Sequence, residues 1–421
     1  MSDMFAEFFD TPDIKPALNK IKKIPFAGYT GNKKKVLQAI WSAMSDEGIV
    51  FNSVFDAFSG SAVFSLFMKY MNKQVISNDF LTSSFLSSYA MVENPGFKLS
   101  YNEMMFVLDD SVEDKSKFVY DNYFNTRFTK AECDNLDIFR SKLSLLDNSY
   151  KSAIAFLLIR MIEAKLPFGG IDKASDLQKH RKKQMENYGK KSDKHDRRIG
   201  LYYDKDMNID FPIWFTKYCK KFNELVFNKE YSFETHDKFL DRNIKQNMFH
   251  DLSFRTGNVN SLVNDFLNGK YYTNNNSLSK PCLSLNCDII ELLESTDFVT
   301  DVVYIDPPYG GNSTDYSYLY QFLEEYTYGK SISDIHEDRE SLKRFSGKKG
   351  YEENFILMLD KMERFPVWVL SYNNKSWASP DYIKKILLRY KKTVNVYSVK
   401  DYIYNFRESR STGTEYIYVA K

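Results

Sequence analysis

The sequence predicts an α/β fold, a doubly wound sheet to which both ends of the chain contribute strands. Near the N-terminus, the apolar run Val54–Asp56 is followed by the small-residue turn Ser59–Ser61, a helical pattern and a second short strand. This order is typical of the first half of a dinucleotide-binding βαβ unit. The alternation stops for about two hundred residues and resumes at Cys282. We therefore expect one sheet with a large, mostly helical domain inserted between its second and third strands.

Each expected element follows from its hydrophobic pattern. The N-terminal part has a helix over Val36–Met44, a strand over Val54–Asp56, a helix over Ala62–Met71 and a strand over Val75–Ile76 that ends at Asn78-Asp79. The clearest helices of the insertion are Ser152–Ala164 and Trp214–Val226. The C-terminal part has strands over Leu283–Cys287, Val302–Ile305, Val367–Leu370, Val394–Val399 and Glu415–Val419, and helices over Ile289–Glu294, Glu353–Glu363 and Tyr382–Tyr390. The predicted domains are residues 1–81 with 281–421, which form the sheet, and the insertion 82–280.

The composition is that of a packed globular protein. The 421 residues include 58 Lys and Arg against 56 Asp and Glu, a formal net charge of +2, and 43% are hydrophobic. This balance excludes a histone-like polycation. It is compatible with a local nucleic-acid surface, because acids elsewhere in the chain cancel a basic stripe in the total.

The cysteines and the N-terminus indicate a cytoplasmic, intracellular protein. The four cysteines include no CxxC pair, and they are too few for a disulfide framework in so long a chain. We expect no metal site, because no zinc-ligand pattern accompanies them. No signal-peptide pattern opens the chain and no run approaches the roughly 18 apolar residues of a membrane span, so we expect no membrane contact.

The sharpest functional signal is Asp306-Pro307-Pro308-Tyr309, directly after the apolar strand Val302–Ile305. Open α/β sheets bind ligands beyond the carboxyl ends of their strands. Two prolines fix φ and remove two backbone donors, so they hold the acid and the ring at a set separation while leaving carbonyl oxygens free. A carboxylate and a carbonyl accept both hydrogens of a planar amino group, and the Tyr309 ring offers a stacking face. The alternative is a rigid loop with an incidental tyrosine.

Two weaker signals lie near the N-terminus. The turn Phe58–Ala62 after Asp56 lets a ligand approach the backbone closely. Asp79 follows Gly60 by 19 residues, the spacing at which an acid receives ribose hydroxyls in nucleotide-binding folds. The alternative for Asp79 is a helix N-cap or loop acid.

These motifs together resemble the class I, S-adenosylmethionine-dependent DNA adenine-N6 methyltransferases, in particular the Dam-like group. PFAGYTGNKKK resembles that family's N-terminal cofactor motif, VFDAFSGSAVF its Gly-rich motif, SNDF its ribose-binding acid and LNCDII the segment facing the cofactor's adenine. DPPY matches the catalytic motif, and VLSYNN and YNFRESRSTGTEYIYVAK resemble the later sheet motifs. The resemblance covers about the first 80 and the last 140 residues. The motif order implies a Rossmann-like methyltransferase sheet with residues 82–280 as the target-recognition, DNA-binding insertion.

The resemblance also implies the site residues. The catalytic ones are Asp306, Pro307, Pro308 and Tyr309. Those that bind the cofactor S-adenosylmethionine are Phe26, Tyr29, Gly31, Asn32, Lys33, Asp56, Phe58, Ser59, Gly60, Ser61, Asp79, Phe80, Asp288, Ile289 and Asp306. One departure is Ala62, which stands where the family usually has a second glycine and crowds the approach to the amino-acid end of the cofactor slightly.

The implied mechanism is base flipping followed by direct transfer. The target adenine leaves the duplex because its amino group is unreachable within the stack. Tyr309 stacks on it, and Asp306 and the carbonyl of Pro307 accept the two amino hydrogens. The methyl group then moves by an in-line displacement whose rate depends mostly on positioning.

The segment Lys179–Arg198 is the candidate for DNA contact, with nine Lys and Arg against three acids. Such a run neutralises several phosphates; the alternative is a solvated loop. The DNA-binding candidates are Lys179, Arg181, Lys182, Lys183, Lys190, Lys191, Arg197 and Arg198. We expect double-stranded DNA as the partner, a cognate restriction endonuclease as a further candidate partner, and a monomer or weak dimer.

Four other functions compete with this interpretation. An RNA amino-group methyltransferase also uses DPPY-like loops, and a catalytically inactive DNA-binding protein is weakly favoured by Ala62. A nuclease lacks support because no acid-acid-lysine cluster is evident. Pro281-Cys282 is the nucleophile dipeptide of cytosine ring-carbon methyltransferases, but Cys282 begins an apolar strand, where a buried structural thiol is usual.

Overall fold

The computed structural model describes residues 13–24, 33–112, 115–164, 177, 208–226, 259–269, 280–309, 320–337, 344–345, 350–374, 377–405 and 410–421. The predicted cofactor residues Phe26, Tyr29, Gly31 and Asn32 lie outside these residues. So do all the predicted DNA-binding residues of the segment 179–198.

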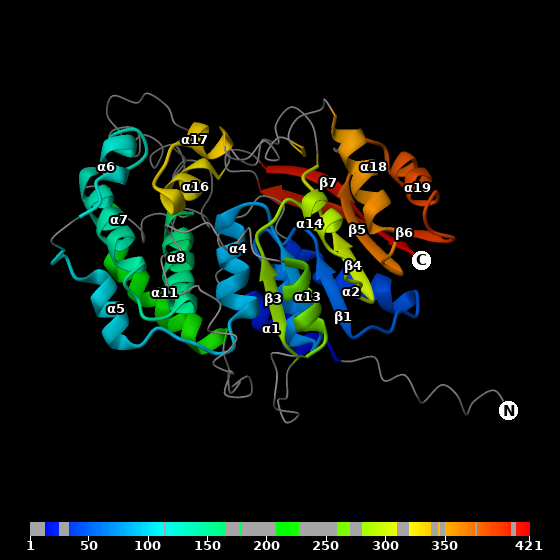
Figure 1. Ribbon diagram of the computed structural model, residues 1–421, viewed down its shortest axis with the longest axis horizontal. Coiled ribbons are helices and arrows are strands. Elements are labelled where there is room, and N and C mark those ends of the chain that lie inside the picture. The colour runs from blue at the N-terminus through cyan, green and yellow to red at the C-terminus, as the bar shows by residue number, and fades with distance from the viewer. Residues whose placement is uncertain are drawn as a thin grey trace.

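A seven-stranded sheet occupies one side of the molecule (Figure 1), with strand order β3-β2-β1-β4-β5-β7-β6. The strands are β1 (Ser53–Asp56), β2 (Gln74–Asn78), β3 (Cys282–Leu285), β4 (Val302–Ile305), β5 (Val367–Asn373), β6 (Val394–Asn405) and β7 (Arg410–Ala420). The first five in this order pair in parallel, and β7 pairs antiparallel with both β5 and β6. β2 pairs directly with β3 across the long stretch of chain between them. The predicted α/β class, with a helical insertion, is confirmed.

Alternating strand residues bury the two faces of the sheet in two different cores. Val54 points into a core with the N-terminal helices and Phe55 into one with the C-terminal helices, as expected for parallel strands covered on both sides. The first face carries α1 (Lys15–Lys23), the short turn η1 (Lys33–Lys35), α2 (Leu37–Asp46) and α3 (Val63–Tyr70). The second carries α13 (Val259–Leu267), α14 (Ile289–Ser295), α18 (Tyr351–Met362) and α19 (Pro380–Leu387).

The closing hairpin is longer than its hydrophobic pattern predicts. We expected strands over Val394–Val399 and Glu415–Val419, but β6 runs to Asn405 and β7 starts at Arg410. The register shifts between Val399 and Tyr402, and pairing continues beyond the shift. The polar pair Lys400-Asp401 interrupts the apolar pattern at this irregularity, which is why the pattern stops there while the backbone ladder does not.

A helical region lies beside the sheet (Figure 1). It contains α4 (Thr82–Ser88), the π-helical turn η2 (Tyr89–Glu93), α5 (Tyr101–Leu108), α6 (Phe118–Tyr123), α7 (Lys130–Leu143), α8 (Ser149–Glu163) and α11 (Phe211–Leu225). Nearly every side chain of α8 is buried, which accounts for its strongly apolar sequence. α8 starts before the predicted Ser152 because Asn148 caps it, accepting from the backbone N–H groups of Tyr150 and Lys151.

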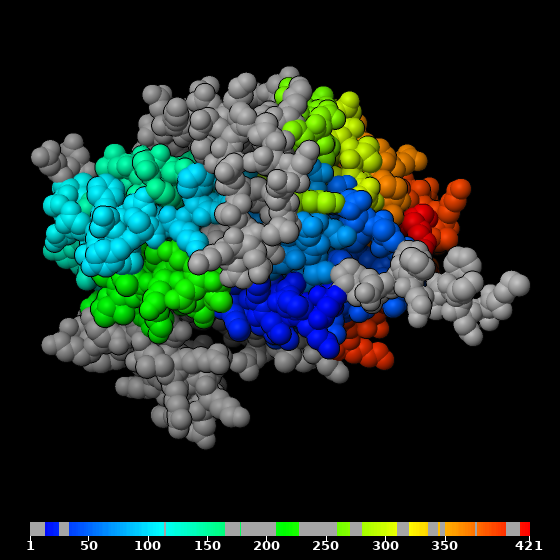
Figure 2. All heavy atoms as spheres, turned by 90° about the horizontal axis from the view of Figure 1, so that it is seen from below, coloured from blue at the N-terminus to red at the C-terminus, as the bar shows by residue number. Residues whose placement is uncertain are grey.

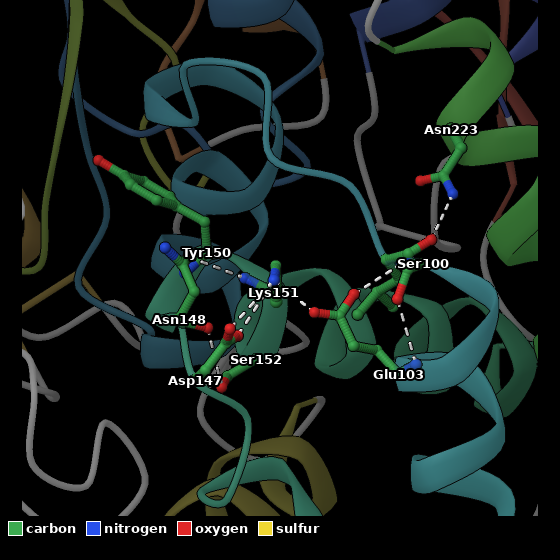
Figure 3. A network of polar contacts seen from close by, with 9 residues as sticks. Ser100, Glu103, Asp147, Asn148, Tyr150, Lys151, Ser152 and Asn223 are labelled. Atoms are coloured by element: carbon green, nitrogen blue, oxygen red, sulfur yellow. Dashed lines mark hydrogen bonds and ion pairs between the residues drawn. The ribbon is translucent and has the colours of Figure 1, made fainter. Parts of the chain in front are cut away.

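Polar contacts fasten three helices of this region together (Figure 3). Lys151 on α8 pairs with Glu103 on α5 and, at 3.1 Å, with Asp147. Glu103 and Ser100 form a capping box at the start of α5. Asn223 on α11 donates to the carbonyl of Leu99 at 2.8 Å. These contacts fix the helical region as a packed unit.

Several contacts join the helical region to the sheet part of the molecule. Seen from below, α1 and α11 are neighbours on the surface (Figure 2), and the Tyr70 hydroxyl on α3 donates to the carbonyl of Leu225 at 3.4 Å. α16 (Gln321–Tyr328) and α17 (Ile332–Glu337) follow β4 in the sequence but lie with the helical region (Figure 1). There the Tyr326 hydroxyl of α16 donates to the carbonyl of Leu136 on α7 at 2.9 Å. In the part of the chain that the structure describes, no helix has the length and apolar character needed to cross a membrane.

Candidate active site

The carboxyl ends of β1, β2, β3 and β4 meet at one edge of the sheet. The strand order reverses between β1 and β4, and this is the position at which open α/β sheets bind ligands. β1, β2 and β4 end at or next to Asp56, Asp79 and Asp306, and Asp288 follows the end of β3 by three residues. The structure thus brings together acids that are up to 250 positions apart in the sequence.

The turn after β1 is shaped by two left-handed residues. Gly60 has φ 52° and Ala62 has φ 60°, ψ 16° at the start of α3. Asp79 fastens this turn to β2, since its Oδ2 accepts from the Gly60 N–H at 2.7 Å and its Oδ1 from the Leu81 N–H at 2.8 Å. Ser59 and Ser61 are buried in the turn, whereas Phe58 is only partly buried. The sequence predicted the turn but not the left-handed backbone of Ala62, which explains why glycine suits that position.

Burial raises the pKa of the acids that end the first two strands. Burial raises the pKa of Asp56 to about 8, although the Ser65 hydroxyl donates to its Oδ2 at 2.5 Å and opposes the rise. Burial likewise raises the pKa of Asp79 to about 6, against the hydrogen bonds from Gly60 and Leu81. Phe80, which follows Asp79, is partly buried at the same edge.

Asp288 caps α14 and pairs with a residue that the sequence did not single out. Its Oδ1 accepts from the N–H groups of Ile290 and Glu291 at 2.9 and 3.1 Å, and Arg344 lies 3.3 Å away. Ile289, beside it, is buried in the core. Phe345 packs edge-to-face on Phe58, with ring centroids 5.6 Å apart. The segment Arg344-Phe345 therefore connects the ends of β1 and β3.

Asp306 contacts Lys33, which the sequence had assigned to the cofactor. Lys33 Nζ lies 2.8 Å from Asp306 Oδ1 and 3.1 Å from Glu415 Oε1, and it also donates to the Tyr309 hydroxyl. The Lys33 side chain is only 4% exposed, so two carboxylates share one buried ammonium group. Burial raises the pKa of Asp306 to about 7; Lys33 opposes this rise and Glu415 adds to it.

Two tyrosines from neighbouring elements hold the DPPY loop in place. Tyr351 on α18 donates its hydroxyl to the carbonyl of Pro308, and Tyr372 on β5 donates to the carbonyl of Tyr309 at 3.0 Å. The backbone N–H of Trp377 donates to the same carbonyl at 3.2 Å. The Tyr309 and Tyr372 rings meet edge-to-face at 5.2 Å and 86°. The loop is thus fixed by contacts that local sequence patterns do not reveal.

Glu415 is the functional candidate that sequence reasoning missed. It is fully buried on β7 and its Oε1 accepts from the Ser371 hydroxyl at 2.7 Å and from the Tyr309 hydroxyl at 3.1 Å. The available signal was a lone acid that begins the apolar stretch Glu415–Val419.

Cys282 is a structural thiol, as its place at the start of an apolar strand predicts. It lies on β3, 4% exposed, and burial raises the pKa of its thiol to about 11. All four cysteines are free. Within the described ranges, no three His, Cys, Asp or Glu side chains are grouped to hold a metal ion.

Two comparisons with known proteins point to the same activity. A family model described as the D12 class N6 adenine-specific DNA methyltransferase matches residues 29–213. The Type II methyltransferase M2.HphI of Haemophilus parahaemolyticus is 26% identical over 404 residues, which cover 95% of this chain and 98% of that protein. Over residues 29–213 the chain is similar to the N6 adenine-specific DNA methyltransferases. Of the functions that the sequence left open, adenine-N6 methylation of DNA is therefore its activity.

The D12-class match covers only part of the candidate site. The matched residues 29–213 include Lys33, the Gly60 turn and Asp79 but end well before Asp306. The DPPY loop reaches the same site because β4 pairs directly with β1. The methyltransferase site is therefore assembled from both sides of the insertion.

Proposed function

We propose that the chain transfers the methyl group of S-adenosylmethionine to the N6 amino group of an adenine flipped out of duplex DNA. The observation that carries the proposal is the partly buried DPPY loop, which hydrogen bonds hold in place at the edge of the sheet where β1 and β4 end. S-adenosylmethionine would supply a methyl group on a sulfonium, ready for displacement by a nitrogen lone pair.

The residues at the ends of β1 to β3 suit a nucleoside-bearing cofactor. The Gly60 turn allows close approach of a ligand to the backbone, and Asp79 lies beside it with a carboxylate able to accept from hydroxyl groups. We assign to this cofactor Asp56, Phe58, Ser59, Gly60, Ser61, Asp79, Phe80, Asp288 and Ile289, with Phe26, Tyr29, Gly31 and Asn32 assigned from the sequence alone. Lys33 and Asp306 belong to the boundary between cofactor and target base.

The DPPY loop is suited to hold an amino group. The carbonyls of Pro308 and Tyr309 accept from Tyr351 and Tyr372, whereas no described residue donates to the carbonyl of Pro307. The Pro307 carbonyl and Asp306 would accept one amino hydrogen each, which draws the nitrogen lone pair out of the ring system and toward the methyl group. The Tyr309 ring would stack on the flipped base.

Asp306 also suits the proton that the reaction releases. After methyl transfer the amino nitrogen carries a positive charge and must lose one hydrogen. A carboxylate whose pKa is raised to about 7 is a better proton acceptor than an ordinary aspartate at neutral pH. Asp306 would therefore first orient the amino group and then receive its proton.

We assign DNA binding to the insertion 82–280 and phosphate contacts to its basic segment 179–198. Removing four of that segment's charges should reduce the salt dependence of DNA affinity by several phosphate contacts. An unchanged salt slope would contradict the assignment. We also propose that the protein is a monomer or weak dimer, which light scattering tests. We propose a cognate restriction endonuclease as a partner, which nuclease assays on host extracts test.

The deciding experiment is product identification. Protein is incubated with methyl-labelled S-adenosylmethionine and duplex DNA or RNA in separate reactions, and the labelled nucleoside is identified after digestion. We expect N6-methyladenine in DNA alone. Label in RNA alone, label in cytosine, or no label with S-adenosylmethionine would overturn the proposal.

A further inference from the structure

A fully buried carboxylate faces the DPPY loop from the closing hairpin. Glu415 Oε1 lies 3.1 Å from Lys33 Nζ and 3.1 Å from the Tyr309 hydroxyl, and it accepts from Ser371 at 2.7 Å. These partners come from η1, the loop after β4, and β5. The Glu415 side chain therefore contacts all three of these elements from the closing hairpin.

Among the residues that the structure describes, two carboxylates of this cluster, Asp306 and Glu415, share the ammonium of Lys33. Without Glu415, the whole positive charge would pair with Asp306 and draw electron density from the oxygen that faces the substrate. With Glu415, Lys33 divides its hydrogen bonds between two acids, and Asp306 stays a stronger acceptor.

Glu415 also determines where Lys33 and Tyr309 lie. Lys33 Nζ is 4.9 Å from the centre of the Tyr309 ring, so the ammonium lies close to the surface on which a base would stack. Ser371 fixes the Glu415 carboxylate, and that carboxylate in turn accepts from the Tyr309 hydroxyl. A displaced Glu415 would release both the cation and the ring.

We propose that Glu415 is a positioning residue for methyl transfer: it holds Lys33 and the Tyr309 hydroxyl so that Asp306 remains basic enough to accept the amino hydrogen. The inference rests on the role proposed above for Asp306. It differs from a purely structural role, in which Glu415 would only hold the hairpin to the sheet.

The pH dependence of the reaction separates the two roles. Around Asp306, burial raises the pKa, Lys33 lowers it and Glu415 raises it. The titratable and charged groups that face Asp306 are Lys33, Asp56, Tyr304, Tyr309, Tyr351 and Glu415. Replacing Glu415 by Gln removes one negative neighbour, so the pKa of Asp306 should fall. The acid limb of the pH–rate profile, the range in which the rate falls as Asp306 becomes protonated, should then move to lower pH.

The test compares Glu415→Gln with the matched control Glu47→Gln. Glu47 accepts from the Tyr397 hydroxyl at 2.8 Å and pairs with Lys421 at 3.0 Å, so it holds the other end of the same hairpin away from the site. Single-turnover transfer is measured from about pH 5.5 to 9 with saturating cofactor and DNA. For Glu415→Gln we expect an acid limb about one pH unit lower and a plateau at least about tenfold slower, with cofactor affinity within about twofold of wild type. Glu47→Gln should keep the wild-type limb.

Several outcomes would overturn the inference. The first is a pH–rate profile of Glu415→Gln that equals that of wild type. The second is a slower plateau rate in Glu415→Gln with the acid limb at its wild-type position. The third is the same shift of the acid limb in Glu47→Gln. If Glu415→Gln does not fold, Ser371→Ala replaces it: loss of the 2.7 Å donor favours protonated Glu415, so the limb should move in the same direction by a smaller amount. An unmoved limb in Ser371→Ala would then count against the inference.

Failure of this inference is distinguishable from failure of the proposed function. If wild type forms no N6-methyladenine, or Asp306→Asn retains full activity, the proposed function fails. If wild type is active, Asp306→Asn is inactive and Glu415→Gln behaves as wild type, only the role of Glu415 fails.

Discussion

Replacing Lys33 by Met removes the cation that two buried carboxylates share. Lys33 Nζ lies 2.8 Å from Asp306 and 3.1 Å from Glu415, and Met fills a similar volume without charge. The remaining carboxylates repel each other, so the pKa of Asp306 should rise from its present value of about 7. Because Asp306 must be ionised to accept the amino hydrogen, the acid limb of the rate profile should move to higher pH, opposite to the shift expected for Glu415→Gln.

The size of the shift follows from the ion pair. At 2.8 Å and an effective dielectric constant of about 20, the attraction between Lys33 and Asp306 is about 6 kcal/mol. This is an upper bound, because the Asp306 side chain is 17% exposed and water screens part of it. If screening leaves one quarter of that energy, losing the ion pair raises the pKa of Asp306 by about one unit. A pKa that rises from about 7 to about 8 lowers the ionised fraction at pH 7 from about half to about a tenth, roughly a fivefold loss of rate.

The assay is single-turnover methyl transfer as a function of pH, with Lys34→Met as the control. Lys34 is in the same short turn, and its ammonium donates to the carbonyls of Lys22 and Ile24. Lys33→Met should lose at least about fivefold at pH 7 and recover most of that loss near pH 9. Because removing one partner of a buried ion pair costs about 3–5 kcal/mol of stability, folding is checked by thermal melting.

Two results would contradict this role of Lys33. A Lys33→Met enzyme that is folded and equally impaired at pH 7 and pH 9 would show that Lys33 does not control the protonation of Asp306. An identical loss in Lys34→Met would show that charge in the turn, and not contact with Asp306, is what matters.

Three further substitutions test other parts of the site. Asp56→Asn should raise the melting temperature more at pH 8.5 than at pH 5. A carboxyl whose folded pKa is about 8 loses its proton only at a cost to the fold, which reaches roughly 5 kcal/mol as the pH rises from about 4 to 8. Ala62→Val should lower the unfolding free energy by at least about 2 kcal/mol in denaturant titrations while Ala62→Gly changes it by less than about 1, because φ is 60° there. Tyr372→Phe, which loses the 3.0 Å bond to the Tyr309 carbonyl, should slow single-turnover transfer several-fold at unchanged limb position.

The sequence was sufficient for the sheet because strand ends carry local signals. Val302–Ile305 running into Asp306-Pro307-Pro308-Tyr309 predicted both a buried strand and the site at its end, and the structure agrees. The turn at Gly60 followed from small residues between a strand and a helix in the same way. What these signals share is that all the residues that define them are consecutive.

The contacts that arrange the site are long-range and left no local pattern. Lys33 meets Tyr309 across 276 positions, and Tyr309 meets Glu415 across 106. Neither spacing has a period that a single sequence displays, so Lys33 was assigned to the cofactor and Glu415 was overlooked. α16 packs on α7 for the same reason: Tyr326 and Leu136 are 190 positions apart.

The central claim is that Asp306 acts directly on the target amino group. Asp306→Asn is compared with Asp301→Asn, which alters a carboxylate at the opposite end of β4 that accepts from the N–H groups of Asn52 and Ser53 at 2.7 and 2.9 Å. Formation of N6-methyladenine in duplex DNA is measured in single turnovers, alongside S-adenosylmethionine affinity. Asp306→Asn should lose at least about a thousandfold in rate with cofactor affinity within about threefold of wild type, while Asp301→Asn stays active. An Asp306→Asn enzyme that retains a tenth or more of the wild-type rate would contradict the account.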